Sequence, residues 1–152
     1  MGHLEEKLRE HQDRRYRLII TDGVFSMDGD LAPVKELAAV AERHDTWLMT
    51  DDAHGLGVLG GGHGSTQGAN VPLQMGTLSK AIGGYGGYLC ASHAVIELMR
   101  NRARTLIYST GLPPATVAAS IAALDIIESD PVLVAQPVAK ARSFTREINL
   151  PD

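Results

Sequence analysis

The 152-residue chain has few features of secreted, membrane or nucleic-acid-binding proteins. It has one cysteine, Cys90, so no internal disulfide can form, which is compatible with a reducing cytoplasm. No apolar run reaches the roughly 18 residues that span a bilayer, and residues 1–17 are too charged for a signal peptide. Fourteen basic and eighteen acidic residues give a net charge of −4, which offers no general attraction for nucleic acid or anionic membranes. We expect a soluble, cytoplasmic protein whose partners are small molecules, with no nucleic acid and no membrane among them.

Helical and extended patterns alternate along the chain. Short apolar runs predict strands at residues 16–23, 46–52, 71–79, 86–92 and 105–110. Apolar residues at helical spacing predict helices at residues 4–15, 34–45, 93–103 and 113–129. Since the strands are short and continuously apolar, we predict an α/β fold with a mostly parallel sheet buried on both faces, and a buried Cys90 within the run YLCAS.

Polar, reactive side chains follow almost every predicted strand. They are Asp22 and Ser26, then Asp51, Asp52 and His54, then Thr77, Ser79 and Lys80, and finally Ser109 and Thr110. Each alone has an ordinary interpretation, such as a turn residue for Asp22 or a cap for Asp51 and Asp52. However, ligands of open α/β sheets bind beyond the carboxyl ends of the strands, so together these side chains predict one site.

Lys80 lies in an unusual setting, the segment GTLSKAIGGYGGY. Glycines leave room for a flat aldehyde cofactor to reach a lysine amine and form a Schiff base. A pyridine aldehyde also needs a carboxylate for its ring nitrogen and hydroxyls for its phosphate. Asp51 can supply the carboxylate, and the candidates for the hydroxyls are Thr77, Ser79, Ser109 and Thr110.

Four motifs carry a resemblance to a known family: TDGVFSMDGDLAP (21–33), TDDAHGLGVLG (50–60), GTLSKAIGGYGGY (76–88) and IYSTGLPPA (107–115). Together they resemble the α-oxoamine synthases, which are pyridoxal 5'-phosphate (PLP) enzymes of fold type I. The resemblance implies the three-layer, mostly parallel sheet of the aminotransferase-like major domain.

The resemblance also implies a role for each matched residue. Lys80 would be the Schiff-base lysine, Asp51 the partner of the ring nitrogen, and His54 and Ser26 the groups near the phenolic oxygen. Thr77 would bind the phosphate in the same subunit, while Ser109 and Thr110 would reach it across a homodimer interface with shared active sites.

The implied reaction joins an amino acid to an acyl thioester with loss of carbon dioxide. DDAHG with YSTGLPP is most similar to members that condense L-alanine with a pimeloyl thioester, carried by coenzyme A or a carrier protein, in biotin biosynthesis. Glycine C-acetyltransferases remain an alternative, although we expect DDSHA there.

The chain also departs from the family. Members are more than twice as long, so the resemblance implies that residues 1–130 are part of the PLP-binding major domain and residues 131–152 the start of the linker or C-terminal domain. The N-terminal segment and the small C-terminal domain would then be missing. In addition, His63 stands where an arginine is usual. We therefore expect the chain alone to have weak activity or none.

Two other classes of function stay open. A metal hydrolase would use Asp51, Asp52, His54 and His63, which are oxygen and nitrogen ligands at short spacing. It would leave the setting of Lys80 unexplained. A non-catalytic fragment of a synthase is the second, because a parallel sheet without its neighbouring strands exposes edges and apolar faces.

Overall fold

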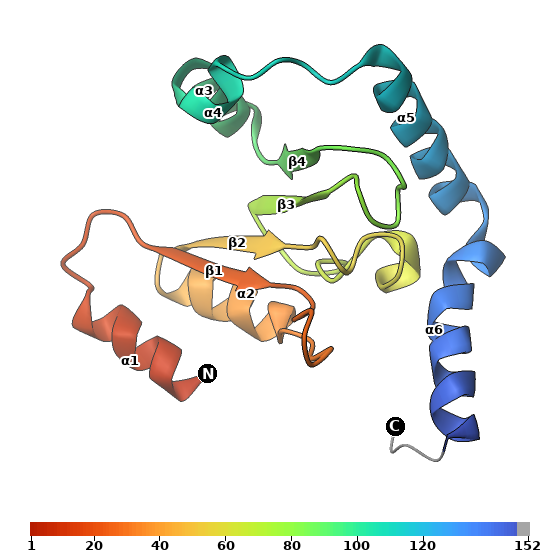
Figure 1. Cartoon of the computed structure of the whole chain (residues 1–152). Helices are drawn as coiled ribbons and strands as arrows, with labels where there is room; N and C mark the ends of the chain where they lie inside the picture. Colours follow the sequence, from red (N-terminus) through yellow and green to blue (C-terminus); the bar gives the residue numbers. More distant parts are fainter. Residues whose placement is uncertain (149–152) are drawn as a thin grey trace.

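A computed structural model describes residues 1–148 of the chain. Figure 1 shows a four-stranded sheet with helices α1 and α2 on one side and the long helices α5 and α6 beside the loops that follow β2 and β3. In chain order the elements are α1 (Gly2–Glu10), β1 (Leu18–Asp22), α2 (Val34–Arg43), β2 (Trp47–Asp51), the short 3₁₀ helix η1 (Gly60–Gly62), β3 (Leu73–Thr77), β4 (Gly87–Cys90), α3 (His93–Arg102), α4 (Arg104–Ile107), α5 (Pro114–Ser129) and α6 (Pro131–Glu147).

The sheet has the strand order β1-β2-β3-β4. Strands β1, β2 and β3 are parallel, and β4 is antiparallel to β3. In the register, Asp22 lies opposite Asp51, and Asp51 lies opposite Met75. The carboxyl ends of the three parallel strands therefore meet at one edge of the sheet, and the prediction of a mostly parallel α/β sheet is confirmed.

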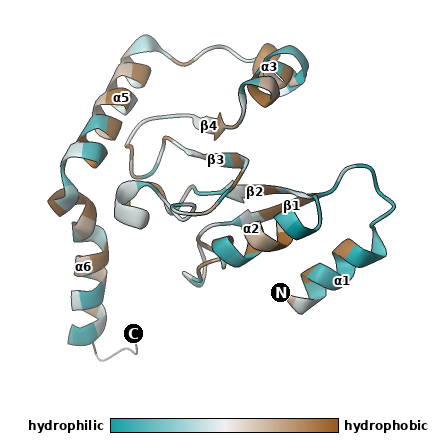
Figure 2. Ribbon diagram, turned by 180° about the vertical axis from the view of Figure 1, so that it is seen from behind, coloured by the Kyte–Doolittle hydropathy of each residue, from teal (hydrophilic) through white to brown (hydrophobic). Residues whose placement is uncertain are grey.

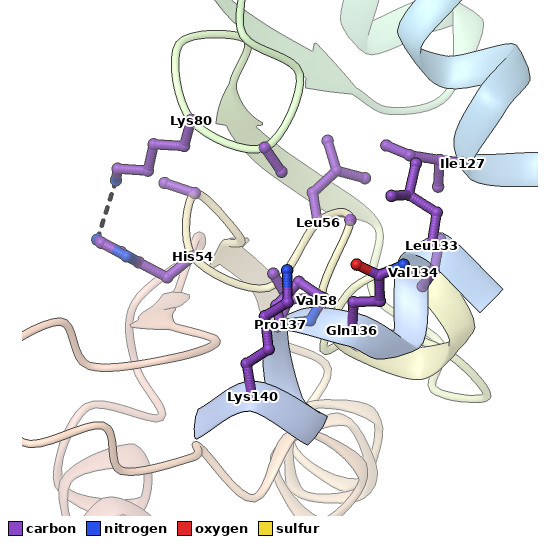
Figure 3. A pocket seen from close by; sticks show the side chains of 13 residues that line it. His54, Leu56, Val58, Lys80, Ile127, Leu133, Val134, Gln136, Pro137 and Lys140 are labelled. Carbon is purple, nitrogen blue, oxygen red and sulfur yellow. Dashed lines mark hydrogen bonds between the residues drawn. The ribbon is translucent and has the colours of Figure 1, made fainter. Parts of the chain in front are cut away.

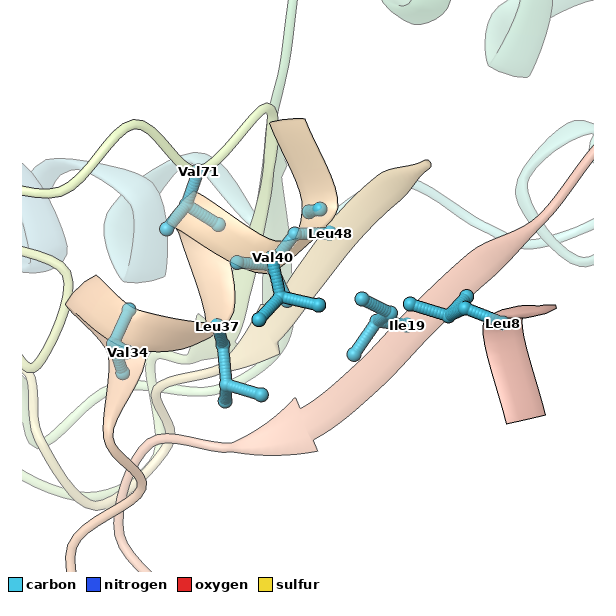
Figure 4. Packing of buried hydrophobic residues seen from close by; sticks show 8 residues of the cluster. Leu8, Ile19, Val34, Leu37, Val40, Leu48 and Val71 are labelled. Atoms are coloured by element: carbon cyan, nitrogen blue, oxygen red, sulfur yellow. The ribbon is translucent and has the colours of Figure 1, made fainter. Parts of the chain in front are cut away.

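The hydrophobic core lies between the sheet and the helices α1 and α2 (Figure 4). Helix α2 forms because Val34, Leu37, Val40 and Ala41 recur at helical spacing and face the sheet, where all four are buried. Leu48 of β2 is completely inaccessible at the centre of this cluster. The complete set of buried residues is Leu8, Ile19, Val34, Leu37, Val40, Ala41, Leu48 and Val71.

The opposite face of β1 and β2 is open in the described part of the chain. Leu18, Ile20 and Trp47 are 48%, 64% and 45% exposed, and they share this face because side chains alternate along a strand. The prediction of a sheet buried on both faces is therefore wrong for residues 1–148, where helices cover only one side of these two strands.

Three local predictions also differ from the structure. The first helix spans Gly2–Glu10, so it begins earlier and ends earlier than the predicted range 4–15. The predicted strand at 105–110 is instead helix α4, because the carbonyl of Ala103 accepts the amides of Leu106 and Ile107 and closes a helical turn. Cys90, predicted to be buried, is exposed at the end of β4, the edge strand.

Helices α5 and α6 form a pair joined at Asp130. Asp130 caps α6 by accepting the amide of Leu133 at 2.9 Å, and proline at the first position of each helix supplies the required backbone angle. Apolar and polar residues are interleaved on both helices (Figure 2), and Ile121 of α5 is 55% exposed. Within residues 1–148, no helix combines the length and apolarity that crossing a membrane requires.

Candidate functional site

The candidate site lies at the carboxyl edge of the parallel strands. His54 and Lys80 each occupy the third position after the last residue of their strand, β2 and β3 respectively. Since β2 and β3 are parallel neighbours, their following turns leave the sheet at the same edge. The structure thus brings together the two turns that the sequence singled out.

Lys80 and His54 form the central contact of this edge. The Nζ atom of Lys80 lies 2.9 Å from Nε2 of His54 (Figure 3), and both side chains are exposed. An ammonium group can only donate, so a charged Lys80 requires an unprotonated Nε2 on His54 and hence a proton on Nδ1. The pair therefore places a primary amine beside an imidazole that can accept or return a proton.

The two neighbouring aspartates have different surroundings. The Oδ1 atom of Asp51 accepts the backbone amide of Ala53 at 3.0 Å, which tightens the turn toward His54. Asp52 is 4% exposed, and its Oδ2 atom accepts the amide of Ser65 at 2.8 Å. Because successive side chains point to opposite sides at the end of a strand, only one of the two carboxylates can serve a given face.

The glycine-rich segment after β3 is a closed turn that carries a hydroxyl pair. The Oγ atoms of Thr77 and Ser79 are 2.7 Å apart, and the Thr77 hydroxyl donates to the carbonyl of Gly86 at 3.0 Å. Gly83 and Gly86 have φ angles of 69° and 109°, which disfavour residues with a side chain. These two glycines are therefore needed by the turn itself, independently of any ligand.

A pocket of about 530 Å³ opens beside Lys80 and His54 (Figure 3). Its walls come from the turns after β2 and β3 and from the junction of α5 and α6. The sequence did not predict that residues of α5 and α6 line this pocket. They do so because both helices pack against the turn that contains Gly57 and Gly62, and no local motif indicates that packing. The lining residues from the helices are Ile127, Leu133, Val134, Gln136, Pro137 and Lys140.

Of the seven predicted site residues, Lys80 and His54 line this pocket. The other five do not, and they are Asp51, Thr77, Ser26, Ser109 and Thr110. Ser26 is exposed in the turn after β1, and Ser109 donates its hydroxyl to the carbonyl of Leu106 at 3.1 Å. Thr110 is exposed after α4. The roles of these five residues in the site therefore stay predictions.

The four candidate metal ligands do not gather. Asp52 turns toward Ser65, whereas His54 contacts Lys80. Within residues 1–148, no group of three or more His, Cys, Asp or Glu side chains is arranged to hold a metal ion. The arrangement therefore lends no geometric support to a site built from Asp51, Asp52, His54 and His63.

Tyr88 is a further residue at this end of the sheet that the sequence did not single out. Burial raises the pKa of Tyr88 to about 12, and the negative charges of Asp52, Cys90 and Asp51 add to the effect. A side chain at Gly76 would lie 2.5 Å from its hydroxyl oxygen, so the tyrosine packs over that glycine. The Tyr88 hydroxyl, whose pKa is raised, therefore stays protonated to a higher pH than that of an ordinary tyrosine.

The chain is similar to curated proteins that are named for an activity. The putative 8-amino-7-oxononanoate synthase of Acidiphilium cryptum is 63% identical over 99% of this chain and 40% of its own length. The 8-amino-7-oxononanoate synthase of Methylocella silvestris is 66% identical over 91% of this chain and 40% of its own length. The chain thus spans about 40% of the length of these curated relatives.

Solved structures share the fold at lower identity. Serine palmitoyltransferase from Sphingomonas wittichii matches 81% of this chain and 33% of its own with a TM-score of 0.71 and 31% identity. The 8-amino-7-oxononanoate synthase from Francisella tularensis matches 82% of this chain and 39% of its own with a TM-score of 0.65 and 32% identity. These matches confirm the expected aminotransferase-like fold and the resemblance to the α-oxoamine synthases. The family model for class I and II aminotransferases matches residues 1–149, and the chain belongs to that family.

Proposed function

We propose that the protein is a PLP-dependent acyltransferase that condenses L-alanine with a pimeloyl thioester, with loss of carbon dioxide, to give 8-amino-7-oxononanoate in biotin biosynthesis. The contact of Lys80 with His54 at 2.9 Å carries the proposal, because it sets a reactive amine beside a proton acceptor at the ligand-binding edge of the sheet. The names of relatives at 57% to 66% identity support this choice of reaction. The chain spans about 40% of the length of these relatives, so their activity is a proposal for this protein.

The residues present fit PLP by their chemistry. Lys80 offers the amine, Asp51 the carboxylate for the ring nitrogen, and Thr77 with its partner Ser79 a hydroxyl pair for the phosphate. Four glycines among residues 81–87 limit the number of side chains in the loop after Lys80. When bound, PLP withdraws electrons from the α-carbon of the amino acid and so stabilises a carbanion there.

The protein's own groups then handle protons and orientation. Lys80 takes the α-proton of L-alanine on Nζ, and His54 holds that amine in place and exchanges a proton with it. Asp51 would keep the ring nitrogen protonated, and His54 and Ser26 would be the groups near the phenolic oxygen. The apolar side chains of Leu133 and its neighbours line the pocket beside Lys80.

Ser109 and Thr110 belong to a second part of the proposal. Both are exposed in the described structure, which leaves their hydroxyls accessible to another subunit. We propose that they bind the phosphate in the partner of a homodimer, so that each active site is shared. We also propose a cytoplasmic location, which suits a single cysteine that is exposed and unpaired.

The domain division is proposed at Asp130. Residues 1–130 would be part of the PLP-binding major domain, and residues 131–152 would begin the linker or C-terminal domain. The division falls between two helices, because Asp130 ends α5 and caps the start of α6. Residues 149–152 of this segment lie outside the described residues.

The test is turnover by the protein expressed from its complete reading frame. L-Alanine with pimeloyl-CoA, or with pimeloyl carrier protein, should yield 8-amino-7-oxononanoate by mass spectrometry, and the Lys80→Ala variant should yield none. Glycine with acetyl-CoA is the control that separates the alternative, glycine C-acetyltransferase. Product only from glycine and acetyl-CoA would favour that alternative, whereas metal-dependent hydrolysis without a PLP chromophore would overturn both.

A further inference from the structure

Asp52 is the one buried charged side chain among residues 1–148, and none of the roles above uses it. Burying a carboxylate is costly unless hydrogen bonds compensate for the lost water. A side chain kept at 4% exposure beside the candidate site therefore calls for a specific function.

Asp52 connects three segments of the chain. Its amide donates to the carbonyl of Met75 in β3 at 2.8 Å, and its own carbonyl accepts the amides of Gly55 and Leu56 at 3.0 and 3.1 Å. Its Oδ2 atom accepts the amide of Ser65, thirteen residues along the chain, at 2.8 Å. The side chain thus closes the loop 53–65 at the same residue that starts the turn to His54.

Three glycines pack closely around the carboxylate of Asp52, where a side chain would overlap with it. A Cβ atom at Gly64 would lie 1.7 Å from Oδ2 of Asp52, and one at Gly55 would lie 2.0 Å from Oδ1. One at Gly23, on the neighbouring strand end, would lie 2.7 Å from Oδ1. Of the three, only Gly64 has a positive φ. At Gly55 the carboxylate of Asp52 excludes a side chain, and at Gly23 Ser65 and Asp52 exclude it together.

A second hydrogen-bond donor lies beside Asp52. The Oδ1 atom of Asp52 and the hydroxyl of Ser65 are both buried without a partner. Both atoms lie near Gly23: a Cβ atom on this glycine would be 2.7 Å from Oδ1 of Asp52 and 2.0 Å from the hydroxyl oxygen of Ser65. A free acceptor and a free donor that share this space satisfy each other through a small rotation of Ser65 or one bridging water.

From these contacts we propose that Asp52 is a positioning residue that binds Ser65, closes the loop 53–65 and thereby holds His54 against Lys80. The imidazole needs such support because, among the described residues, its one hydrogen bond is to Lys80. Asp52 acts here as a hydrogen-bond acceptor of fixed size, and its charge is not required. The kinetic part of this inference rests on the proposed function.

The test compares four proteins expressed from the complete reading frame: wild type, Asp52→Ala, Asp52→Asn and Gly23→Ala. Alanine removes the acceptor, whereas asparagine keeps it in the same volume. Gly23→Ala leaves Asp52 in place but adds a Cβ atom 2.0 Å from the Ser65 hydroxyl and 2.7 Å from Oδ1 of Asp52, so it disturbs their contact from another segment. We expect kcat to fall about 10- to 100-fold in Asp52→Ala and Gly23→Ala, because a misplacement of about 1 Å costs that much, and to stay within about threefold in Asp52→Asn.

The ring resonances of His54 provide a readout that does not depend on turnover. Assigned through a His54→Gln variant, they should shift in Asp52→Ala and Gly23→Ala and keep their wild-type positions in Asp52→Asn. Lower thermal stability in Asp52→Ala and Gly23→Ala, with unchanged kcat and unchanged His54 resonances, would overturn the inference. An Asp52→Asn variant that is as impaired as Asp52→Ala would also overturn it.

If Asp52→Ala does not fold, Gly23→Ala and Asp52→Asn still decide the question. If no 8-amino-7-oxononanoate forms, the proposed function fails while the resonances still test the positioning of His54.

Discussion

Lys80 and His54 lie 26 residues apart in the chain, yet their side-chain nitrogens are 2.9 Å apart. Each is the third residue beyond its strand, and the two strands are parallel neighbours, so equal spacing in sequence becomes proximity in space. The contact between the two side chains therefore depends on the register of β2 with β3 and on the turns that follow these strands.

The first prediction concerns Lys80. Replacing it with alanine or arginine should abolish the absorbance that PLP gains near the visible edge and lower turnover on the order of 10³-fold or more, because neither side chain offers a free amine at neutral pH. Absorption spectra and initial rates measure both effects. Lys7→Ala is the matched control, since Lys7 is exposed on α1, far along the chain from Lys80, and pairs with Glu10. A chromophore that persists in Lys80→Arg would show that another amine binds the cofactor.

The second prediction concerns His54. His54→Gln keeps a polar side chain of similar reach but cannot exchange protons, so kcat should fall about 10²-fold or more, with a small change in KM for L-alanine. Steady-state kinetics with saturating pimeloyl thioester separate the two constants. An increase in KM with unchanged kcat would mean that His54 binds substrate and does not move protons.

The third prediction concerns the pH dependence of Tyr88. Burial, with the charges of Asp52, Cys90 and Asp51, raises its pKa to about 12, so the folded protein holds this proton where the unfolded chain, with an ordinary pKa near 10, loses it. The free energy of unfolding should therefore fall as the pH rises from about 10 to about 12, and fall less in Tyr88→Phe. Spectrophotometric tyrosine titration should lose its component near pH 12 in this variant. Tyr16→Phe, at a 76% exposed position, is the control, and loss of that component there instead would contradict the assignment.

The fourth prediction concerns the wall of the pocket. A Cβ atom at Gly62 would lie 2.6 Å from Cγ2 of Ile127, while one at Gly61 would meet nothing within 4 Å. Both glycines have positive φ, so alanine should cost about 1–2 kcal/mol of unfolding free energy at either position, and the overlap should add about 1–3 kcal/mol at Gly62.

Urea unfolding of Gly61→Ala, Gly62→Ala, Ile127→Ala and the double variant of Gly62→Ala with Ile127→Ala measures this difference. Removing the Ile127 side chain should recover the extra loss at Gly62, which a double-mutant cycle isolates from the backbone strain. Additive effects of the two substitutions would mean that α5 does not pack on η1 in solution.

Much of the fold was predictable from periodicity. Helices α2, α3 and α5 and strands β1 to β4 lie where the apolar patterns placed them. The strand predicted at residues 105–110 shows where periodicity fails. The segment TLIY is mostly apolar and contains β-branched residues, which favours a strand, but the carbonyl of Ala103 accepts the amides of Leu106 and Ile107 and so forms a helical turn. The exposure of Cys90 and of Ile20 could not be foreseen either, since burial depends on which elements cover a strand.

The sequence by itself determined the chemistry of the candidate site: a lysine in a glycine-rich turn, an aspartate after the preceding strand and a histidine three residues beyond it. These are local choices of residue type and spacing, so they can be read along the chain. Only the tertiary structure decided that Asp52 is buried against Ser65 and three glycines, and that α5 and α6 form a wall beside Lys80. The physical reason is that burial and contact between distant segments arise from packing, which depends on the register of the sheet and the close approach that particular glycines allow.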